Sequence, residues 1–140
     1  MNLNSRKVLF MKLFFLGLFA FLVVGQAAAQ RLKNSNGTII GYIENGRVKS
    51  SNGAIVGYID NDRIKNSNGS IMGYREDDRI KNSNGTVIGY CDGQRVKNSN
   101  GTIIGYVEDG RVKNSNGTVI GYFEGVRRIE AALYFFFFFY

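Results

Sequence analysis

The sequence predicts an all-β fold in which tandem β-hairpins close into a symmetric ring. The first observation is an internal repeat of 16 residues, whose copies begin without any insertion at Arg31, Arg47, Arg63, Arg79, Arg95 and Arg111. The second is that each copy alternates short β-branched or aromatic segments with turns rich in Asn, Gly, Asp and Ser, and shows no helical periodicity. A repeat of this kind decides the architecture before local propensities do.

The unit Arg79–Gln94 illustrates how one repeat is expected to fold. Two apolar segments flank Ser83–Gly85, and two strands joined by a turn that contains Asn-Gly form a β-hairpin. The acidic block at the end of the unit turns the chain into the next hairpin. Six units therefore predict twelve short strands, with a turn about every eight residues.

The pairing register within a hairpin has two alternatives, and a shift of one residue moves every side chain to the other face. A two-residue turn at Asn84 and Gly85 would pair Ile80 with Gly89. A three-residue loop, with Gly85 in the left-handed conformation, would pair Ile80 with Ile88 instead. We favour the second register.

This register predicts which side chains form the core. It places Ile80, Ile88 and Tyr90 inside the ring, and it places the position held by Arg75 in one repeat and Cys91 in the next on the outer face. The tyrosine never varies among the six repeats, as expected of a packed aromatic ring. A second apolar column is expected to be at least half-buried between hairpins: Ile39, Ile55, Ile71, Val87, Ile103 and Val119.

The repeats are expected to form a closed ring rather than an open stack. A single hairpin is marginally stable in water, and an open stack needs polar caps, which the first repeat lacks. Closure removes the unpaired edges. Division at the acidic turns leaves single strands at the two ends, Arg31–Asn34 and Thr118–Phe123, which can pair with each other. Between them lie five whole hairpins: Thr38–Lys49, Ala54–Lys65, Ser70–Lys81, Thr86–Lys97 and Thr102–Lys113.

The tandem motif Asn-Gly-Thr/Ser-x-Ile/Val-Gly-x-Ile-Glu-x-x-x-Arg-Ile/Val-Lys, behind a leader, resembles the bacterial five-fold β-flower proteins. The resemblance covers Arg31–Glu124. It implies a symmetric, flower-like or ring-like all-β assembly and a periplasmic or extracellular location, and it brings no catalytic residues. Because the chain holds six Asn-Gly units, the choice between a five-fold and a six-fold ring stays open.

Residues 1–29 have the composition of a secretory signal peptide that is cleaved after Ala29. A basic start precedes the apolar run Leu13–Gly25, and small residues follow. The alternative is a membrane anchor, but the run is shorter than the roughly 20 apolar residues of a spanning helix. We therefore expect a secreted or periplasmic protein without a stable membrane span. The leader carries three basic residues and no acids, so cleavage lowers the formal net charge from +7 to +4.

Residues 30–126 form the predicted six-repeat domain, and residues 127–140 are an atypical tail. The tail breaks the repeat pattern at Arg128 and ends in seven consecutive aromatic residues, Tyr134–Tyr140. This run is too short to span a bilayer, and it would promote aggregation if it were exposed. We expect the tail to be disordered or to be an artefact of a frame-shifted or truncated gene end, the alternative being a membrane or sorting signal.

The composition predicts a non-enzymatic protein with no catalytic residues, no metal site and no cofactor. The sequence has no His, and Cys91 is its only Cys, so a Cys/His pair and an intramolecular disulfide are both excluded. All the acids except Glu130 lie in repeat turns, where Asp and Glu are common. Basic residues recur in every repeat and are followed by acids, which argues against the one-sided basic patch of a nucleic-acid-binding protein.

Two functions remain after these exclusions. We favour a structural or scaffold protein of the periplasm or cell exterior. The alternative is a module that binds glycans or cell-wall polymers, with avidity from the repetition of Tyr, Arg and Lys. The exposure of the tyrosine rings discriminates between the two, because a buried ring cannot contact a ligand. The candidate binding residues are Tyr42, Tyr58, Tyr74, Tyr90, Tyr106 and Tyr122.

Overall fold

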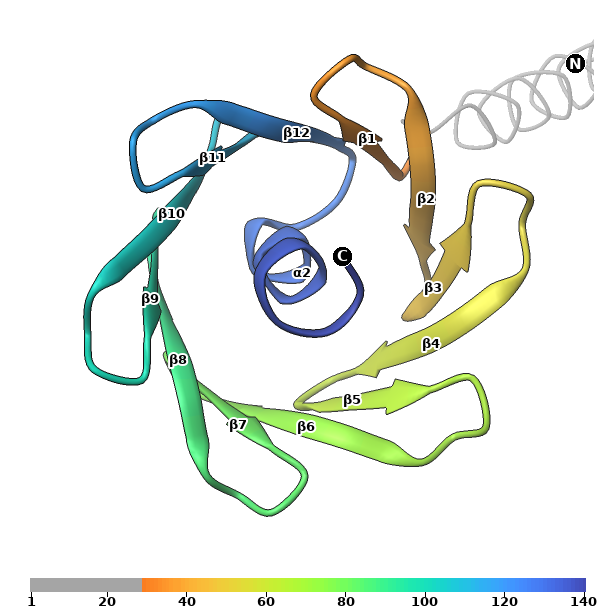
Figure 1. The fold of residues 1–140 in the computed structure, drawn as a ribbon. Coiled ribbons are helices and arrows are strands. Elements are labelled where there is room, and N and C mark those ends of the chain that lie inside the picture. Colours follow the sequence, from red (N-terminus) through yellow and green to blue (C-terminus); the bar gives the residue numbers. More distant parts are fainter. Residues whose placement is uncertain (1–28) are drawn as a thin grey trace, which may run out of the picture.

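A computed structural model describes residues 29–140 as a closed ring of antiparallel strands around a short helical segment (Figure 1). The strands are β1 (Arg31–Asn34), β2 (Ile39–Glu44), β3 (Arg47–Ser50), β4 (Ile55–Asp60), β5 (Arg63–Asn66), β6 (Ile71–Glu76), β7 (Arg79–Asn82), β8 (Val87–Asp92), β9 (Arg95–Asn98), β10 (Ile103–Glu108), β11 (Arg111–Asn114) and β12 (Val119–Glu124). The helical segment consists of α2 (Arg128–Ala132) and the π-helix η1 (Leu133–Phe138). Except for Ala29, the expected signal peptide lies outside the described residues.

Each repeat forms one hairpin, here called a petal, and six petals complete the ring. Each strand pairs with the strands before and after it in the chain, and the first strand, β1, also pairs with the last, β12. At this closure Lys33 faces Tyr122, and the Lys33 ammonium lies 2.6 Å from the Glu124 carboxylate. The same ion pair joins Lys49 to Glu44 between the first two petals, at 3.2 Å. The predicted closed ring of hairpins is confirmed, and its symmetry is six-fold.

The Asn-Ser-Asn-Gly segment forms the outer turn of five petals, and Ser-Ser-Asn-Gly forms that of the second. In the turn between β7 and β8, the Asn82 N–H donates to the Thr86 carbonyl at 2.9 Å, and the Gly85 N–H donates to the Asn82 carbonyl at 3.0 Å. Gly85 has a φ of 84°, which a residue without Cβ adopts readily. This is the expected three-residue loop with a left-handed glycine.

The predicted register is nevertheless wrong, because a β-bulge follows the loop. Lys81 faces Val87, but Ile80 faces Gly89, so Ile88 is an extra residue in the longer strand. The other five petals show the same shift. The bulge restores the pairing that a two-residue turn would have produced, and it reverses the face of each side chain beyond it.

The core consequently differs from the expected one. The residue after the Arg that begins each repeat is fully buried, as expected for Ile80. The position of Cys91, expected outside, faces this residue from the neighbouring strand and is also buried in four petals, at Ile43, Ile59, Cys91 and Val107. The tyrosines, expected inside, lie on the opposite face because side chains alternate along a strand. The second apolar column is half-buried as expected, except at Ile55, which is exposed.

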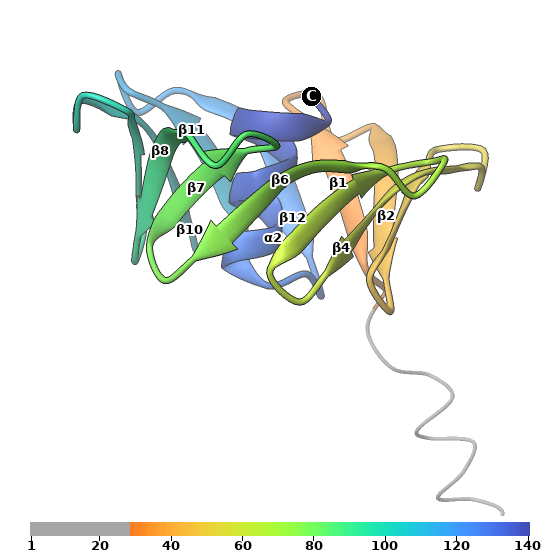
Figure 2. The ribbon, with the colours of Figure 1, turned by 90° about the horizontal axis from the view of Figure 1, so that it is seen from below.

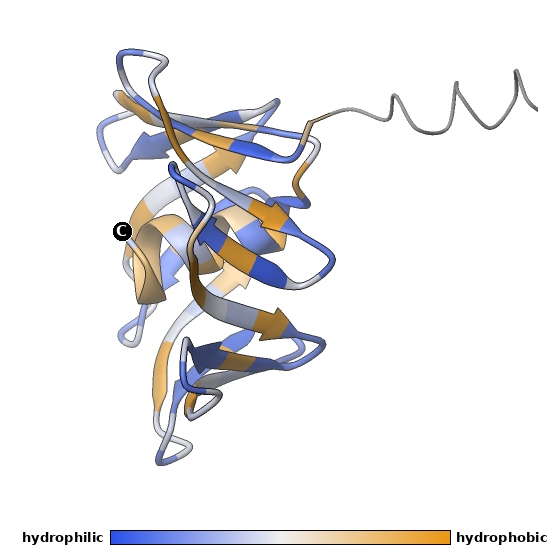
Figure 3. Ribbon diagram, turned by 90° about the vertical axis from the view of Figure 1, so that its right-hand side faces the viewer, coloured by the Kyte–Doolittle hydropathy of each residue, from blue (hydrophilic) through white to orange (hydrophobic). Residues whose placement is uncertain are grey.

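The expectation of a disordered tail is also wrong. Residues 128–138 are helical and run along the axis of the ring (Figure 2). Ala131, Ala132 and Leu133 are inaccessible to solvent or nearly so. Figure 3 shows this largely hydrophobic segment surrounded by strands in which hydrophobic and hydrophilic residues alternate. The tail is ordered because the inner faces of the petals provide an apolar surface for it to cover.

Candidate functional site

Each candidate tyrosine occupies the same place on the outer face of the ring. Tyr58, for example, faces Arg47 on one neighbouring strand and Lys65 on the other. The same Arg–Tyr–Lys triplet recurs in every petal, and its members lie side by side across three strands. The structure therefore does not gather the six tyrosines into one site, but gives each its own surroundings.

All six tyrosines are half-buried. Their exposure alone therefore does not discriminate between a ligand-binding module and a scaffold. The lysine of each triplet is paired with an acid, in the pairs Lys33–Glu124, Lys49–Glu44, Lys65–Asp60, Lys81–Glu76, Lys97–Asp92 and Lys113–Glu108. Within residues 29–140, the arginine of each triplet forms no ion pair. The outer face thus holds one unpaired cation per petal beside a partly covered ring.

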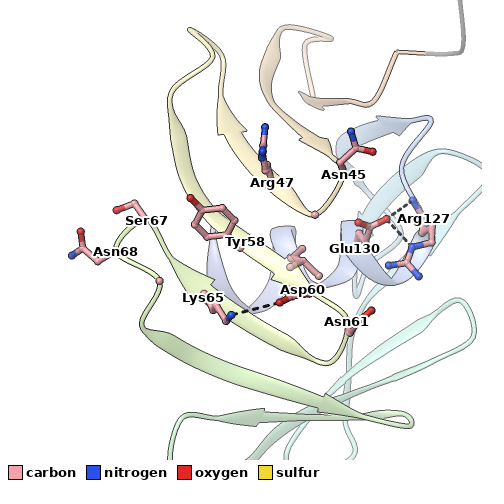
Figure 4. Close-up of a pocket in the computed structure, with 13 residues that line it drawn as sticks. Asn45, Arg47, Tyr58, Asp60, Asn61, Lys65, Ser67, Asn68, Arg127 and Glu130 are labelled. Atoms are coloured by element: carbon pink, nitrogen blue, oxygen red, sulfur yellow. Dashed lines mark hydrogen bonds and ion pairs between the residues drawn. The ribbon is translucent and has the colours of Figure 1, made fainter. Parts of the chain in front are cut away.

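A groove runs beside Tyr58, between the second and third petals (Figure 4). Its volume is about 600 Å³. The residues that line it come from the inner turn before β3 and the start of β3, from β4 and the inner turn after it, from β5 and the outer turn of the third petal, and from the start of the helical segment: Asn45, Gly46, Arg47, Tyr58, Ile59, Asp60, Asn61, Lys65, Ser67, Asn68, Gly69, Arg127 and Glu130. Similar grooves lie beside Tyr122 and Tyr90, with volumes of about 550 and 340 Å³.

The grooves offer hydrogen-bonding groups but no reactive pair. In the groove beside Tyr122, the Lys33 ammonium donates to Glu124 and lowers the pKa of this carboxyl, and outside the three grooves Lys81 does the same to Glu76. Both acids are therefore ionised at neutral pH. Among residues 29–140 there is no cluster of three or more His, Cys, Asp or Glu side chains that could hold a metal ion. The arrangement can contact a polar ligand, and it does not assemble a nucleophile with a base.

Cys91 and Arg75 lie on the inner face of the ring and contribute to none of the three grooves. Cys91 is 6% exposed, and burial raises the pKa of its thiol to about 11. Arg75 is half-buried, and its Nε is covered without a hydrogen-bond partner. A buried neutral thiol is unreactive, so Cys91 is a core residue.

The feature that the sequence reasoning missed is at the centre of the ring. We call Tyr134–Phe139 the aromatic axle. Each of its six residues lies against the glycine that precedes the tyrosine in a different petal, in the pairs Tyr134 with Gly41, Phe135 with Gly121, Phe136 with Gly105, Phe137 with Gly89, Phe138 with Gly73, and Phe139 with Gly57. Along the axle the contacts begin at the first petal and then pass from the sixth petal to the second, so the axle follows the ring in the direction opposite to the chain. The sequence signal that could have suggested this is the length of the aromatic run, whose seven residues exceed the number of petals by one.

Two close approaches explain why each petal has glycine at this position. A Cβ at Gly57 would lie 2.6 Å from Phe139 Cε1, and 2.5 Å from the Lys65 carbonyl oxygen of the neighbouring strand. At Gly121 the corresponding distances are 2.6 Å to the Phe135 ring and 2.7 Å to the Lys33 carbonyl. Any side chain here would displace both the axle and a strand.

The winding of the axle fits the symmetry of the ring. The Phe139 N–H donates to the Tyr134 carbonyl at 3.2 Å, an i to i+5 bond, and the two rings stack with centroids 5.9 Å apart. Six equal petals lie about 60° apart, whereas an α-helix turns by about 100° per residue. The wider π-helix turns less per residue and so comes closer to the spacing of the petals, and successive aromatic side chains lie against successive petals.

The start of the helical segment is fixed by one ion pair. Glu130 Oε1 accepts a hydrogen bond from the Arg127 Nε at 2.9 Å and another from the Arg127 backbone N–H at 3.3 Å. An acidic side chain in the first turn also favours the helix through its dipole. These contacts set the direction in which the chain leaves β12 and enters the ring.

A family model described as 5-fold beta-flower protein matches residues 29–139. The match includes the aromatic axle. Searches of curated proteins and of solved structures returned no match. The structure has six petals where the family description says five, and it shares the all-β repeated-hairpin architecture. The chain belongs to the 5-fold β-flower protein family.

Proposed function

We propose that this β-flower protein is an exported, non-enzymatic structural protein that acts as a scaffold in the periplasm or at the cell exterior. The observation that carries the proposal is that the chain fills its own ring. Ala131, Ala132 and Leu133, together with the first residues of the axle, occupy the space that a ligand of the ring interior would need. What remains accessible is a repeated polar outer surface.

Two further properties support a structural role outside the cytoplasm. A closed ring has no free strand edge, which protects an all-β protein from aggregation without the help of disulfides. The leader has the composition of an export signal. No helix of residues 29–140 is long and apolar enough to cross a bilayer.

The alternative, glycan or cell-wall-polymer binding, receives less support. Each tyrosine is half-buried between Arg and Lys side chains, so it does not present an open flat ring for a sugar to stack on. The lysine in each groove is already paired with an acid. The grooves therefore offer only part of what the alternative requires.

Fractionation of cells that express the full-length chain tests the location. We expect the protein in the periplasmic or external fraction with Gln30 at its N-terminus, and a chain without residues 1–29 should stay in the cytoplasm. Recovery of the full-length chain from the cytoplasm would contradict export.

A sedimentation assay with purified cell-wall polymers tests the role. We expect no saturable binding, and no difference between the unmodified protein and the variant Y58A. Saturable binding that is weakened by Y58A and by the equivalent substitutions would replace the scaffold proposal with the alternative.

A further inference from the structure

The axle and the petals correspond one to one. Six consecutive residues from Tyr134 to Phe139 lie against six different petals, and none is shared. Tyr140, the seventh aromatic residue, has no glycine partner and is 66% exposed. The correspondence therefore ends with the number of petals, although the aromatic run does not.

The correspondence depends on the winding of the axle as well as on its length. Tyr134 and Phe139 are five residues apart, and their glycines, Gly41 and Gly57, belong to adjacent petals. Five steps thus carry the axle around the ring to one petal short of its start. An α-helix turns by about 100° per residue, which departs further from the roughly 60° spacing of the petals than the wider axle does.

We propose that the aromatic axle sets the number of petals: the ring closes with one axle residue per petal, and the length of the axle selects six. Each petal contributes a surface around its glycine that only an inward-facing aromatic side chain can cover. A missing aromatic side chain would leave an uncovered apolar surface at one petal, and a surplus one would lie beyond the petals, as Tyr140 does, largely exposed and against the Phe135 ring.

The test is a cycle of four chains that combines the number of petals with the length of the axle. One pair keeps six petals and ends either at Phe139 or at Phe138. The other pair lacks residues 79–94, which removes β7 and β8 and joins Asp78 to Arg95, the residue that begins the next repeat. This pair also ends at Phe139 or Phe138. Melting temperatures are measured by circular dichroism.

We expect the loss of Phe139 to lower the melting temperature of the six-petal chain by about 10 °C, as for the removal of a half-buried aromatic side chain. In the five-petal chain the same loss should change it by less than about 2 °C, because five rings suffice for five petals. An equal loss in both chains overturns the proposal. So does a five-petal chain that is unfolded with either axle.

A second comparison uses only the six-petal chain. F139A removes a ring that lies against a petal, whereas Y140A removes an aromatic residue of similar size with no petal of its own. The proposal expects a fall in melting temperature for F139A and little change for Y140A. Equal effects would show that the axle contributes general hydrophobic burial and does not set the number of petals. Family members with five repeats are expected to have five axle residues.

Discussion

Phe139, near the end of the chain, packs against Gly57 in the second petal so closely that a Cβ at Gly57 would lie 2.6 Å from the ring. The equivalent contact recurs in every petal through a different axle residue. The tail therefore touches all six repeats, although it follows them in the sequence. Ring and axle are expected to unfold together, since neither buries its apolar face alone.

Replacement of Gly57 by alanine is expected to destabilise the fold by about 1–3 kcal/mol, because a methyl group has no room between the axle and the neighbouring strand. Urea unfolding followed by circular dichroism measures the loss. In the F139A background the cost of G57A should be smaller but not zero, because the Phe139 ring is gone while the Lys65 carbonyl oxygen would still lie 2.5 Å from the new methyl group. Wild-type stability of G57A would contradict the packing described here.

Replacement of Arg75 by isoleucine should stabilise the protein by about 1–3 kcal/mol, the cost of a buried polar group without a partner. Arg75 occupies the inner position that is Ile43 and Ile59 in the first two petals, and its covered Nε has no hydrogen-bond partner. The control R63I changes an exposed arginine and should give no such gain. A lower urea midpoint for R75I would indicate that Arg75 makes a favourable contact that this prediction omits.

Cys91 is expected to resist alkylation in the folded protein at pH 8 and to react quickly in urea. Burial raises the pKa of its thiol from 9.0 to about 11, so the folded state holds this proton more tightly than the unfolded state does. The associated stability is complete below pH 9 and is lost as the pH rises towards 11. The variant C91V should lose less stability between pH 8 and pH 10.5 than the unmodified protein. Equal alkylation rates with and without urea would show that the thiol is accessible.

The second petal should gain stability when Ser50 is replaced by asparagine. In the fourth petal, Asn82 Oδ1 accepts backbone hydrogen bonds from Asn84 and Thr86, each at 3.0 Å. The Ser50 hydroxyl instead donates to Asn52 Oδ1. Two regained hydrogen bonds should raise the free energy of unfolding by about 0.5–1.5 kcal/mol.

The reverse change provides the control for this prediction. N82S should lower the free energy of unfolding by a similar amount, because it removes the acceptor from the same turn. The two variants can be compared in one urea titration. If S50N and N82S shift the midpoint in the same direction, the asparagine oxygen is not the source of the difference.

The correct predictions rest on interactions between residues close together in the sequence, and the incorrect ones depend on interactions between distant parts of the chain. The loop with left-handed Gly85 was predicted because turn chemistry is local. The register was not, because the bulge at Ile88 follows from how the strands meet the core and the axle. The shared location of the six tyrosines on one face follows from the repeat, but which face they occupy depends on that bulge.

The sequence by itself determined the repeat length, the twelve strands, the turn between them and the closure of Arg31–Asn34 onto the last strand. These depend on patterns within 16 residues and on the cost of free strand edges. Only the tertiary structure decided which face of the strands each side chain occupies, the half-buried state of the tyrosines and the place of the tail. A run of aromatic residues has no local reason to be ordered. It is ordered here because six glycines from six distant repeats form a surface that fits one aromatic residue each.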